Sequence, residues 1–394
     1  MPAADGTFLV FLALLIAAAA GFFAARYTAK PRLPPGRTLN DEYFAGLNFL
    51  LNEEPDRALE VFLRMAQIDD ETVETHFALG SLYRRRGEVD RSIRVHESVL
   101  ARPDLNAEHR EHAMFALAED YFRAGVFDRA EELFERIPAT SARQAAALRY
   151  LLRIREQQRE WEHAIETHQR LAQRAAPEHP TAIAHYHCER AELAAAAGRV
   201  EEAREHLRKA RAQQRMFPRG ALLRARLALA EGDAPLAARL CRRAVEFHPH
   251  LLPIVLPPLV EALRAQDVDA AEPGLRELVR TTPERRAQIG YAAIVTGLDS
   301  EPVLLECVRD LLREDANLSD LVPALAGDQL DRPGADLTRL ARALSRVFRR
   351  TQQYRCVDCG FATARHFWQC PGCRGWDTLA PVASVELAPM ARRR

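Results

Sequence analysis

The pattern of apolar and polar positions divides this chain into parts of different character. Near its start, residues 7–25 (TFLVFLALLIAAAAGFFAA) form an uncharged apolar run of about 19 residues. As a helix this run rises roughly 28 Å, which matches the roughly 30 Å hydrocarbon core of a bilayer. The pattern therefore predicts one transmembrane helix at residues 7–25, preceded by a short N-terminus of residues 1–6.

A cleavable signal peptide is the alternative interpretation of this run, because its stretch of small residues resembles a cleavage region. A signal peptide carries positive charge before its apolar stretch, whereas only Asp5 precedes this one. Positive residues instead follow the run, at Arg26, Lys30, Arg32 and Arg37. This asymmetry favours an N-terminus outside and the rest of the chain in the cytoplasm, joined to the anchor by a basic, proline-rich linker at residues 26–38.

From residue 39 to residue 250 the pattern repeats and is helical. A small residue recurs at intervals of 34, 38, 34, 39 and 34 residues, namely Ala58, Ser92, Ala130, Ala164, Ala203 and Ala237. This period is typical of tetratricopeptide repeats, in which two helices pack closely through small side chains. An unrelated alanine-rich helical bundle is the alternative, but five intervals in register argue against it.

Other positions follow the same register. The close-contact position of the first helix lies twelve residues before each small residue, at Gly46, Gly80, Ala118, Leu152, Ala191 and Ala225. A larger side chain lies four residues after each small residue, at Phe62, His96, Phe134, His168, Leu207 and Cys241. Turns between helices hold Gly87, Gly125, Gly198 and Gly232, where a helix end favours the left-handed conformation.

The repeat signature weakens after residue 250. We predict degenerate repeats and capping helices for residues 251–350, with helix pairs at 251–279 and 284–317 and an amphipathic helix at 337–350. The predicted fold class is therefore all-α: a tetratricopeptide-repeat solenoid with one N-terminal transmembrane helix and a small C-terminal metal module.

The most specific chemistry lies in that module, at residues 351–380, ahead of a tail at residues 381–394. Two Cys-x-x-Cys pairs, Cys356 with Cys359 and Cys370 with Cys373, have the spacing of a tetrathiolate site for one zinc or iron ion. Gly360 follows the first pair, where positive φ lets backbone N–H groups point at the sulfurs. A disulfide or a thioredoxin-like redox dithiol is the alternative, but the short spacing leaves no room for a βαβ unit.

The remaining cysteines, Cys188, Cys241 and Cys307, lie singly in helical patterns and are expected to be buried small side chains. No phosphate-binding loop, nucleophile elbow or metalloprotease helix occurs, so we expect no enzymatic activity. With 55 basic and 55 acidic residues the formal net charge is zero, which gives no indication of nucleic-acid binding. The histidine pairs His185/His187 and His248/His250 are expected to be solvated or partly packed, each with its two rings on different faces.

These features together resemble the lipopolysaccharide assembly protein B family of Gram-negative bacteria. The resemblance covers nearly the whole chain and is most specific at residues 354–378 (YRCVDCGFATARHFWQCPGCRGWDT), with further likeness at 43–51 (YFAGLNFLL) and 79–94 (LGSLYRRRGEVDRSIR). It implies a rubredoxin-like C-terminal module that packs on the repeats and binds metal through the four cysteines. Residues 251–331 are proline-rich and depart from the family pattern.

The resemblance also implies a function and partners. It implies a non-enzymatic, single-pass inner-membrane adaptor with a periplasmic N-terminus and a cytoplasmic body, which restrains lipopolysaccharide synthesis by promoting degradation of the deacetylase LpxC by the membrane protease FtsH. Other lipopolysaccharide assembly proteins are further expected partners, and a homodimer stays open. The residues leave two alternatives: a general scaffold for envelope-assembly enzymes, and an electron-transfer protein with a rubredoxin-like iron centre.

Overall fold

The computed structural model describes residues 17, 39–52, 54–68, 73–175, 181–215, 217–267, 271–298, 302–314, 344 and 354–381. The predicted transmembrane helix (apart from Ala17), the linker, the amphipathic helix at 337–350 (apart from Leu344) and the tail after residue 381 lie outside the described residues. Within those residues, no helix is long and apolar enough to cross a membrane. The chain divides into two compact units, residues 1–158 and 159–394, which are described separately.

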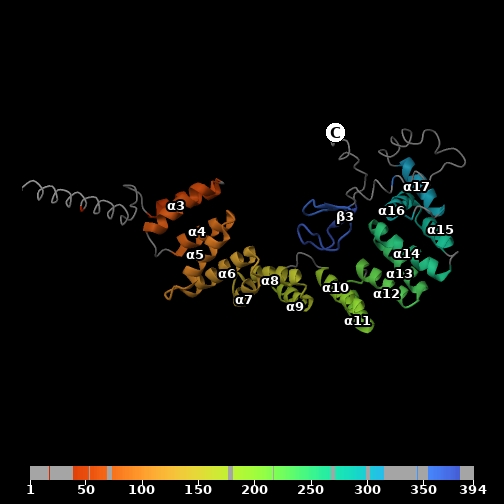
Figure 1. Ribbon diagram of the computed structural model, residues 1–394, viewed down its shortest axis with the longest axis horizontal. Helices are drawn as coiled ribbons and strands as arrows, with labels where there is room; N and C mark the ends of the chain where they lie inside the picture. The colour runs from red at the N-terminus through yellow and green to blue at the C-terminus, as the bar shows by residue number, and fades with distance from the viewer. Residues whose placement is uncertain are drawn as a thin grey trace, which may run out of the picture. The chain divides into compact units, whose positions relative to one another are not determined.

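The first unit consists of helices that pair as antiparallel neighbours along the chain, α2 with α3, α4 with α5 and α6 with α7, followed by α8 (Figure 1). Their bounds are α2 (Leu39–Leu51), α3 (Pro55–Ile68), α4 (Val73–Arg85), α5 (Val89–Leu100), α6 (Ala107–Ala124), α7 (Phe127–Glu135) and α8 (Gln144–Gln158).

Close packing within these pairs depends on the small residues. All six small residues predicted from the repeat are buried, with 0 or 1 % of their surface exposed. In the first pair a Cβ placed on Gly46 would lie 2.7 Å from the Phe62 ring, so the glycine leaves space for that ring. In the second pair Gly80 lies against the His96 ring, and the Ser92 hydroxyl donates a hydrogen bond to the Gly80 carbonyl at 2.7 Å. The repeat pattern therefore identified the residues at which the helices meet.

The fourth repeat differs from the predicted register in two ways. Leu151 is fully buried, whereas the predicted close-contact residue Leu152 is half-buried. The four turn glycines adopt positive φ as predicted, but the equivalent turn of this repeat uses Arg159, with φ 60°. A side chain in this conformation costs about 1–2 kcal/mol.

The described part of the second unit contains helices α9 to α17, the short 3₁₀ helices η1 and η3, and a small sheet (Figure 1). The helices are α9 (Trp161–Ala172), α10 (Ala182–Ala196), α11 (Val200–Gln213), α12 (Pro218–Ala230), α13 (Ala234–Phe247), η1 (Pro249–Leu251), α14 (Leu252–Gln266), α15 (Ala271–Thr281), η3 (Pro283–Arg285), α16 (Arg286–Thr296) and α17 (Pro302–Glu314).

The described part of the proline-rich stretch after residue 250 is helical. α14 continues through Pro257 and Pro258 although a proline donates no backbone hydrogen bond. Its apolar face joins a large core that runs through the helices from α12 to α17, with Val255, Leu256 and Leu259 fully buried. Burial of these side chains compensates for the missing hydrogen bonds.

The sheet belongs to the C-terminal segment and has three short antiparallel strands in the order β2-β1-β3. Central strand β1 (Tyr354–Cys356) pairs with β2 (Ala362–Thr363) on one side and β3 (Leu379–Pro381) on the other. Tyr354 lies opposite Thr363 and Pro381, and Cys356 lies opposite Leu379. The sheet thus brings the two ends of the module together.

Candidate metal centre

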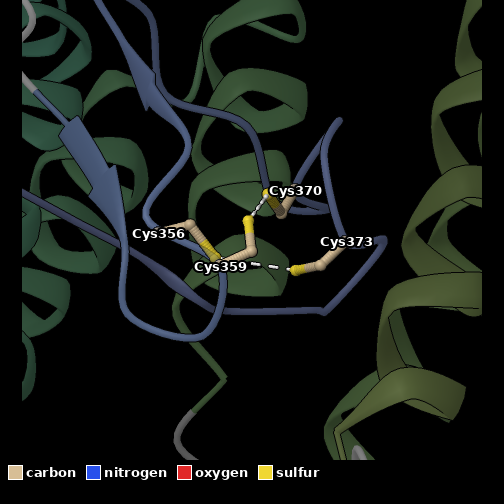
Figure 2. Close-up of side chains that lie close together, drawn as sticks. All are labelled: Cys356, Cys359, Cys370 and Cys373. Carbon is tan, nitrogen blue, oxygen red and sulfur yellow. Dashed lines mark hydrogen bonds between the residues drawn. The ribbon is translucent and has the colours of Figure 1, made fainter. Parts of the chain in front are cut away.

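The four predicted cysteines meet at one point of the C-terminal module. Cys356 ends β1 and Cys359 lies in the turn after it, while Cys370 and Cys373 lie in the turn closed by the Gln369–Trp376 bridge. Their sulfur atoms all lie within 4.8 Å of one another, as Figure 2 shows. Cys356 and Cys370 are buried, and Cys359 and Cys373 are exposed.

The distances fit a tetrahedral metal ion. A metal–sulfur bond of about 2.3 Å places the corners of a regular tetrahedron about 3.8 Å apart. The Cys356 and Cys373 sulfurs are 3.6 Å apart, and the Cys359 and Cys370 sulfurs are 3.7 Å apart. Four thiolates in this arrangement suit zinc and iron alike.

The two turns that carry the cysteines have the same backbone design. In the first, the Gly360 N–H donates to the Cys356 carbonyl at 3.0 Å; in the second, the Arg374 N–H donates to the Cys370 carbonyl at 2.9 Å. Both donors adopt positive φ, 74° at Gly360 and 66° at Arg374. The prediction for Gly360 is confirmed, whereas Arg374 gives no comparable signal in the sequence.

Polar groups around Cys356 favour its thiolate. Burial acts to raise the pKa of this thiol, but the Thr378 hydroxyl and the backbone N–H groups of Cys359 and Asp358 lower it to about 6. The Thr378 oxygen lies 3.3 Å from the sulfur. A thiolate is the form that binds a metal, so this environment prepares one ligand before the ion arrives.

The module contacts α10 of the repeats through the residues that follow Cys373. The Trp376 ring stacks on the His185 ring, with centroids 4.5 Å apart, and meets the Tyr186 ring edge-on at 5.8 Å. The Asp377 carboxylate accepts a hydrogen bond from the Thr181 hydroxyl at 2.8 Å and lies 2.9 Å from His185 Nε2. Since α10 begins at Ala182, this carboxylate lies at a helix N-terminus, where negative charge is stabilised.

The charges at this contact are consistent with an ionised aspartate beside a neutral histidine. Burial lowers the pKa of His185, and Asp377 only partly offsets that effect. Burial would raise the pKa of Asp377, but the neighbouring His185 and Thr181 side chains lower it below its ordinary range. Arg219, itself buried, lies with one guanidinium nitrogen 3.5 Å from His185 Nδ1 and pairs with Glu189 at 2.7 Å.

The structural role of His185 could not be predicted from the sequence. We expected solvated or partly packed histidines at His185 and His187, but the structure buries His185 fully. The expectation of different faces is confirmed for this pair, because His187 instead approaches His206, with the two Nδ1 atoms 3.3 Å apart. It is wrong for His248 and His250, whose rings meet edge-on with centroids 5.9 Å apart, because the chain leaves α13 at His248 and the spacing of a continuous helix no longer applies. The helical period shows that His185 lies on a packed face of its helix. It does not show what packs there, because the partner residues lie almost two hundred residues further along the chain.

Protein-family models match the helical repeats and the C-terminal module separately. A model described as rubredoxin metal binding domain matches residues 354–381. Models described as tetratricopeptide repeat match residues 75–111, 115–180 and 188–251. The chain is therefore a helical tetratricopeptide-repeat protein with a C-terminal module of the four-cysteine, zinc-ribbon-like kind.

Curated relatives match almost from end to end. Lipopolysaccharide assembly protein B of Escherichia coli strain K12 is 31% identical over 387 residues, which cover 96% of this chain and 99% of that protein. The protein of the same name from Haemophilus influenzae is 29% identical over 393 residues, with the same coverage. Among solved structures, the C-terminal part of a repeat-containing protein from Cytophaga hutchinsonii covers 61% of this chain and 95% of its own at 15% identity and a TM-score of 0.39, too low to carry an argument.

Proposed function

The chain belongs to the lipopolysaccharide assembly protein B family, and we propose that it acts as a non-catalytic, membrane-anchored adaptor that restrains lipopolysaccharide synthesis. In this proposal it presents the deacetylase LpxC to the membrane protease FtsH, and degradation of LpxC limits the supply of lipid A. Tetratricopeptide repeats are a scaffold for protein contacts, which suits a protein that brings two others together.

The observation that supports an adaptor most directly is the seating of the four-cysteine module on the repeats. The Trp376 and Asp377 side chains connect the module to α10 through a ring stack and a polar contact with the buried His185. A module fixed in this way extends the surface of the repeats instead of offering a separate reaction centre. Each part then contributes to one binding surface.

We propose that Cys356, Cys359, Cys370 and Cys373 hold one metal ion, zinc or iron, and that the ion is structural. It would supply the stability that so short a segment cannot gain by burial. The Cys356 environment and the matched turns support this assignment. A reversible one-electron couple whose loss abolishes function would instead favour an electron-transfer protein.

We further propose that residues 7–25 anchor the protein in the inner membrane, with residues 1–6 in the periplasm and the body, from the linker at 26–38 onward, in the cytoplasm. An anchor raises the effective concentration of membrane partners, so even weak contacts suffice. Deleting residues 1–30 should leave a folded but inactive protein. Full activity of that fragment would contradict the anchor.

The adaptor role is tested by depleting the protein in its own bacterium and measuring the half-life of LpxC and total lipopolysaccharide. We expect LpxC to become long-lived and lipopolysaccharide to accumulate. A Cys241→Ala copy should restore the short half-life, because Cys241 lies apart from the four clustered cysteines, whereas a Cys370→Ser copy should not. An unchanged half-life after depletion would contradict the adaptor role and leave a general assembly scaffold.

A further inference from the structure

A groove between α11, α12 and α13 has a composition that no structural role explains. Its volume is about 630 Å³. Apolar side chains form much of its lining, including Leu207, Phe217, Leu236, Leu240 and Phe247, of which Phe247 is 48% exposed. Five arginines surround this apolar surface: Arg211, Arg215, Arg224, Arg239 and Arg243.

Among the described residues none of these five arginines forms an ion pair with a carboxylate. By contrast, Arg204 on α11 pairs with Glu201 and Glu231, and Arg219 on α12 pairs with Glu189. Among the described residues that line the groove, none is acidic. In a chain with equal numbers of acidic and basic residues, this is a local separation of charge.

The positive charges are close enough to repel one another. Burial lowers the pKa of Arg224, and the charges of Arg211 and Arg243 lower it further. Arg243 also lies over the Phe247 ring, 5.9 Å from its centroid. An anionic occupant would relieve this repulsion while it covers the exposed phenyl ring.

We propose that this arginine groove binds an extended peptide segment of a partner protein in which acidic side chains alternate with apolar ones. Carboxylates of the segment pair with the guanidinium groups, and its apolar side chains cover Phe247 and the leucines. Arginine is suited to this role because its planar group binds a carboxylate through two parallel hydrogen bonds.

The distribution of the arginines favours a peptide over a phosphorylated lipid. They come from three helices and from the loop after α11, and apolar side chains lie among them. A single phosphate is held by donors that converge on one point, whereas an extended chain carries side chains every 3.3 Å or so and needs partners along its length. This inference goes beyond the proposed function, because the purified protein should bind such a peptide whether or not LpxC and FtsH are its partners.

The test is a selection of random twelve-residue peptides displayed on phage against the full-length protein in detergent micelles. We expect the selected peptides to be enriched in Asp and Glu relative to the starting library. A synthetic copy of the best peptide should bind about tenfold or more weakly to the R224E/R243E variant, and its affinity should fall with added salt. The R226E variant is the matched control, because Arg226 is exposed on α12 but does not line the groove.

Three results would overturn the proposal: no enriched peptide, enrichment without acidic residues, or equal weakening by R226E. The milder R224Q/R243Q variant, checked by its thermal midpoint, separates loss of binding from loss of fold. Titration with dihexanoylphosphatidylglycerol tests the lipid alternative. Binding of that lipid through Arg224 and Arg243, with no acidic peptide selected, would make the groove a lipid site and would also overturn the proposal.

Discussion

The repeats and the C-terminal module achieve order by different means. The repeats bury whole faces of helices, and their closest contacts rest on small residues such as Ala58 and Ala130, which are fully buried. The module, residues 354–381, buries only a few side chains of its own, chiefly Tyr354, Cys356, Cys370 and Leu379. Under the proposed function, its order comes from the metal ion that the four cysteines would hold and from its contact with α10.

The module and the repeats should therefore differ in how strongly a single change destabilises them. A structural zinc ion contributes on the order of 10 kcal/mol or more to a small domain, which exceeds what any one side chain of the repeats supplies. A change in the module should thus be severe but local, whereas a change in the repeats should be moderate.

Loss of one metal ligand should have the largest effect. Cys370→Ser should abolish metal binding and unfold the module, at a cost on the order of 10 kcal/mol of binding free energy. Metal content per chain, measured by elemental analysis of purified protein, checks this. Cys241→Ala is the control, since Cys241 is buried in the repeats, and its metal content should stay at that of the unaltered protein. A Cys370→Ser protein with full metal content would contradict the assignment.

Removal of the main docking side chain should come next. Trp376→Ala should lower the free energy of unfolding by about 3–5 kcal/mol. The change removes a large buried side chain, its stack on His185 and its edge-on contact with Tyr186. Protease cleavage of the module should become faster while the repeats remain resistant. Phe367→Ala, at a more exposed aromatic of the same module, is the control. Equal protease sensitivity of the two variants would show that the stack contributes little.

Acid should destabilise the folded C-terminal module by a smaller amount. Burial lowers the pKa of His366 from 6.5 to about 4, so the folded module leaves this ring neutral where the unfolded chain would protonate it. The contribution of His366 is complete above pH 6.5 and declines as the pH falls toward 4, by up to about 3 kcal/mol. Thermal midpoints between pH 8 and pH 4.5 check this. His366→Gln should show a shallower slope than the unaltered protein, and identical slopes would contradict the prediction.

In the repeats, filling a close contact should cost less still. Gly46→Ala places a methyl group against the buried Phe62 ring and should destabilise the first helix pair by about 1–3 kcal/mol. Urea unfolding checks this. Ala45→Gly, at a half-buried neighbouring position, measures the difference in intrinsic helix preference between alanine and glycine. It should lower the free energy of unfolding by about 1 kcal/mol. A stabilised Gly46→Ala protein would show that the two helices have room to separate.

The smallest effect should be a gain. Arg159→Gly relieves the left-handed turn at φ 60° and should stabilise the protein by up to about 1 kcal/mol. Gln158→Gly, just before the turn and inside α8, should instead destabilise. Midpoints of thermal unfolding for the two variants should shift in opposite directions, and a shift in the same direction would contradict this account of the turn.

The sequence predicted the repeats well because their determinants are local. The spacing from Ala58 to Ala237 follows from the size of a helix pair, and the same spacing located the larger partners such as Phe62 and His96. The prediction was less accurate where the repeat departs from its own pattern. At the fourth repeat an arginine occupies the turn position of a glycine and Leu151 takes the core position, and neither exception is visible from the period.

For the candidate metal centre, the four cysteines and Gly360 were recognisable because ligand spacing and turn geometry are short-range. Arg374 was missed because its left-handed conformation is enforced by the second turn and not by its own preference. The contact of His185 with Trp376 and Asp377 was missed because it joins distant segments, and helical periodicity shows only that a face is covered. The arginine groove likewise appears only when three helices are assembled.

The most direct test of this contrast is hydrogen exchange of the full-length protein, followed by mass spectrometry, before and after a chelator removes the metal. We predict that amides of residues 354–381 lose their protection while those of α12 to α14 keep theirs, and that adding zinc back restores the module. Retained protection of residues 354–381 without metal, or a parallel loss throughout the repeats, would contradict the account.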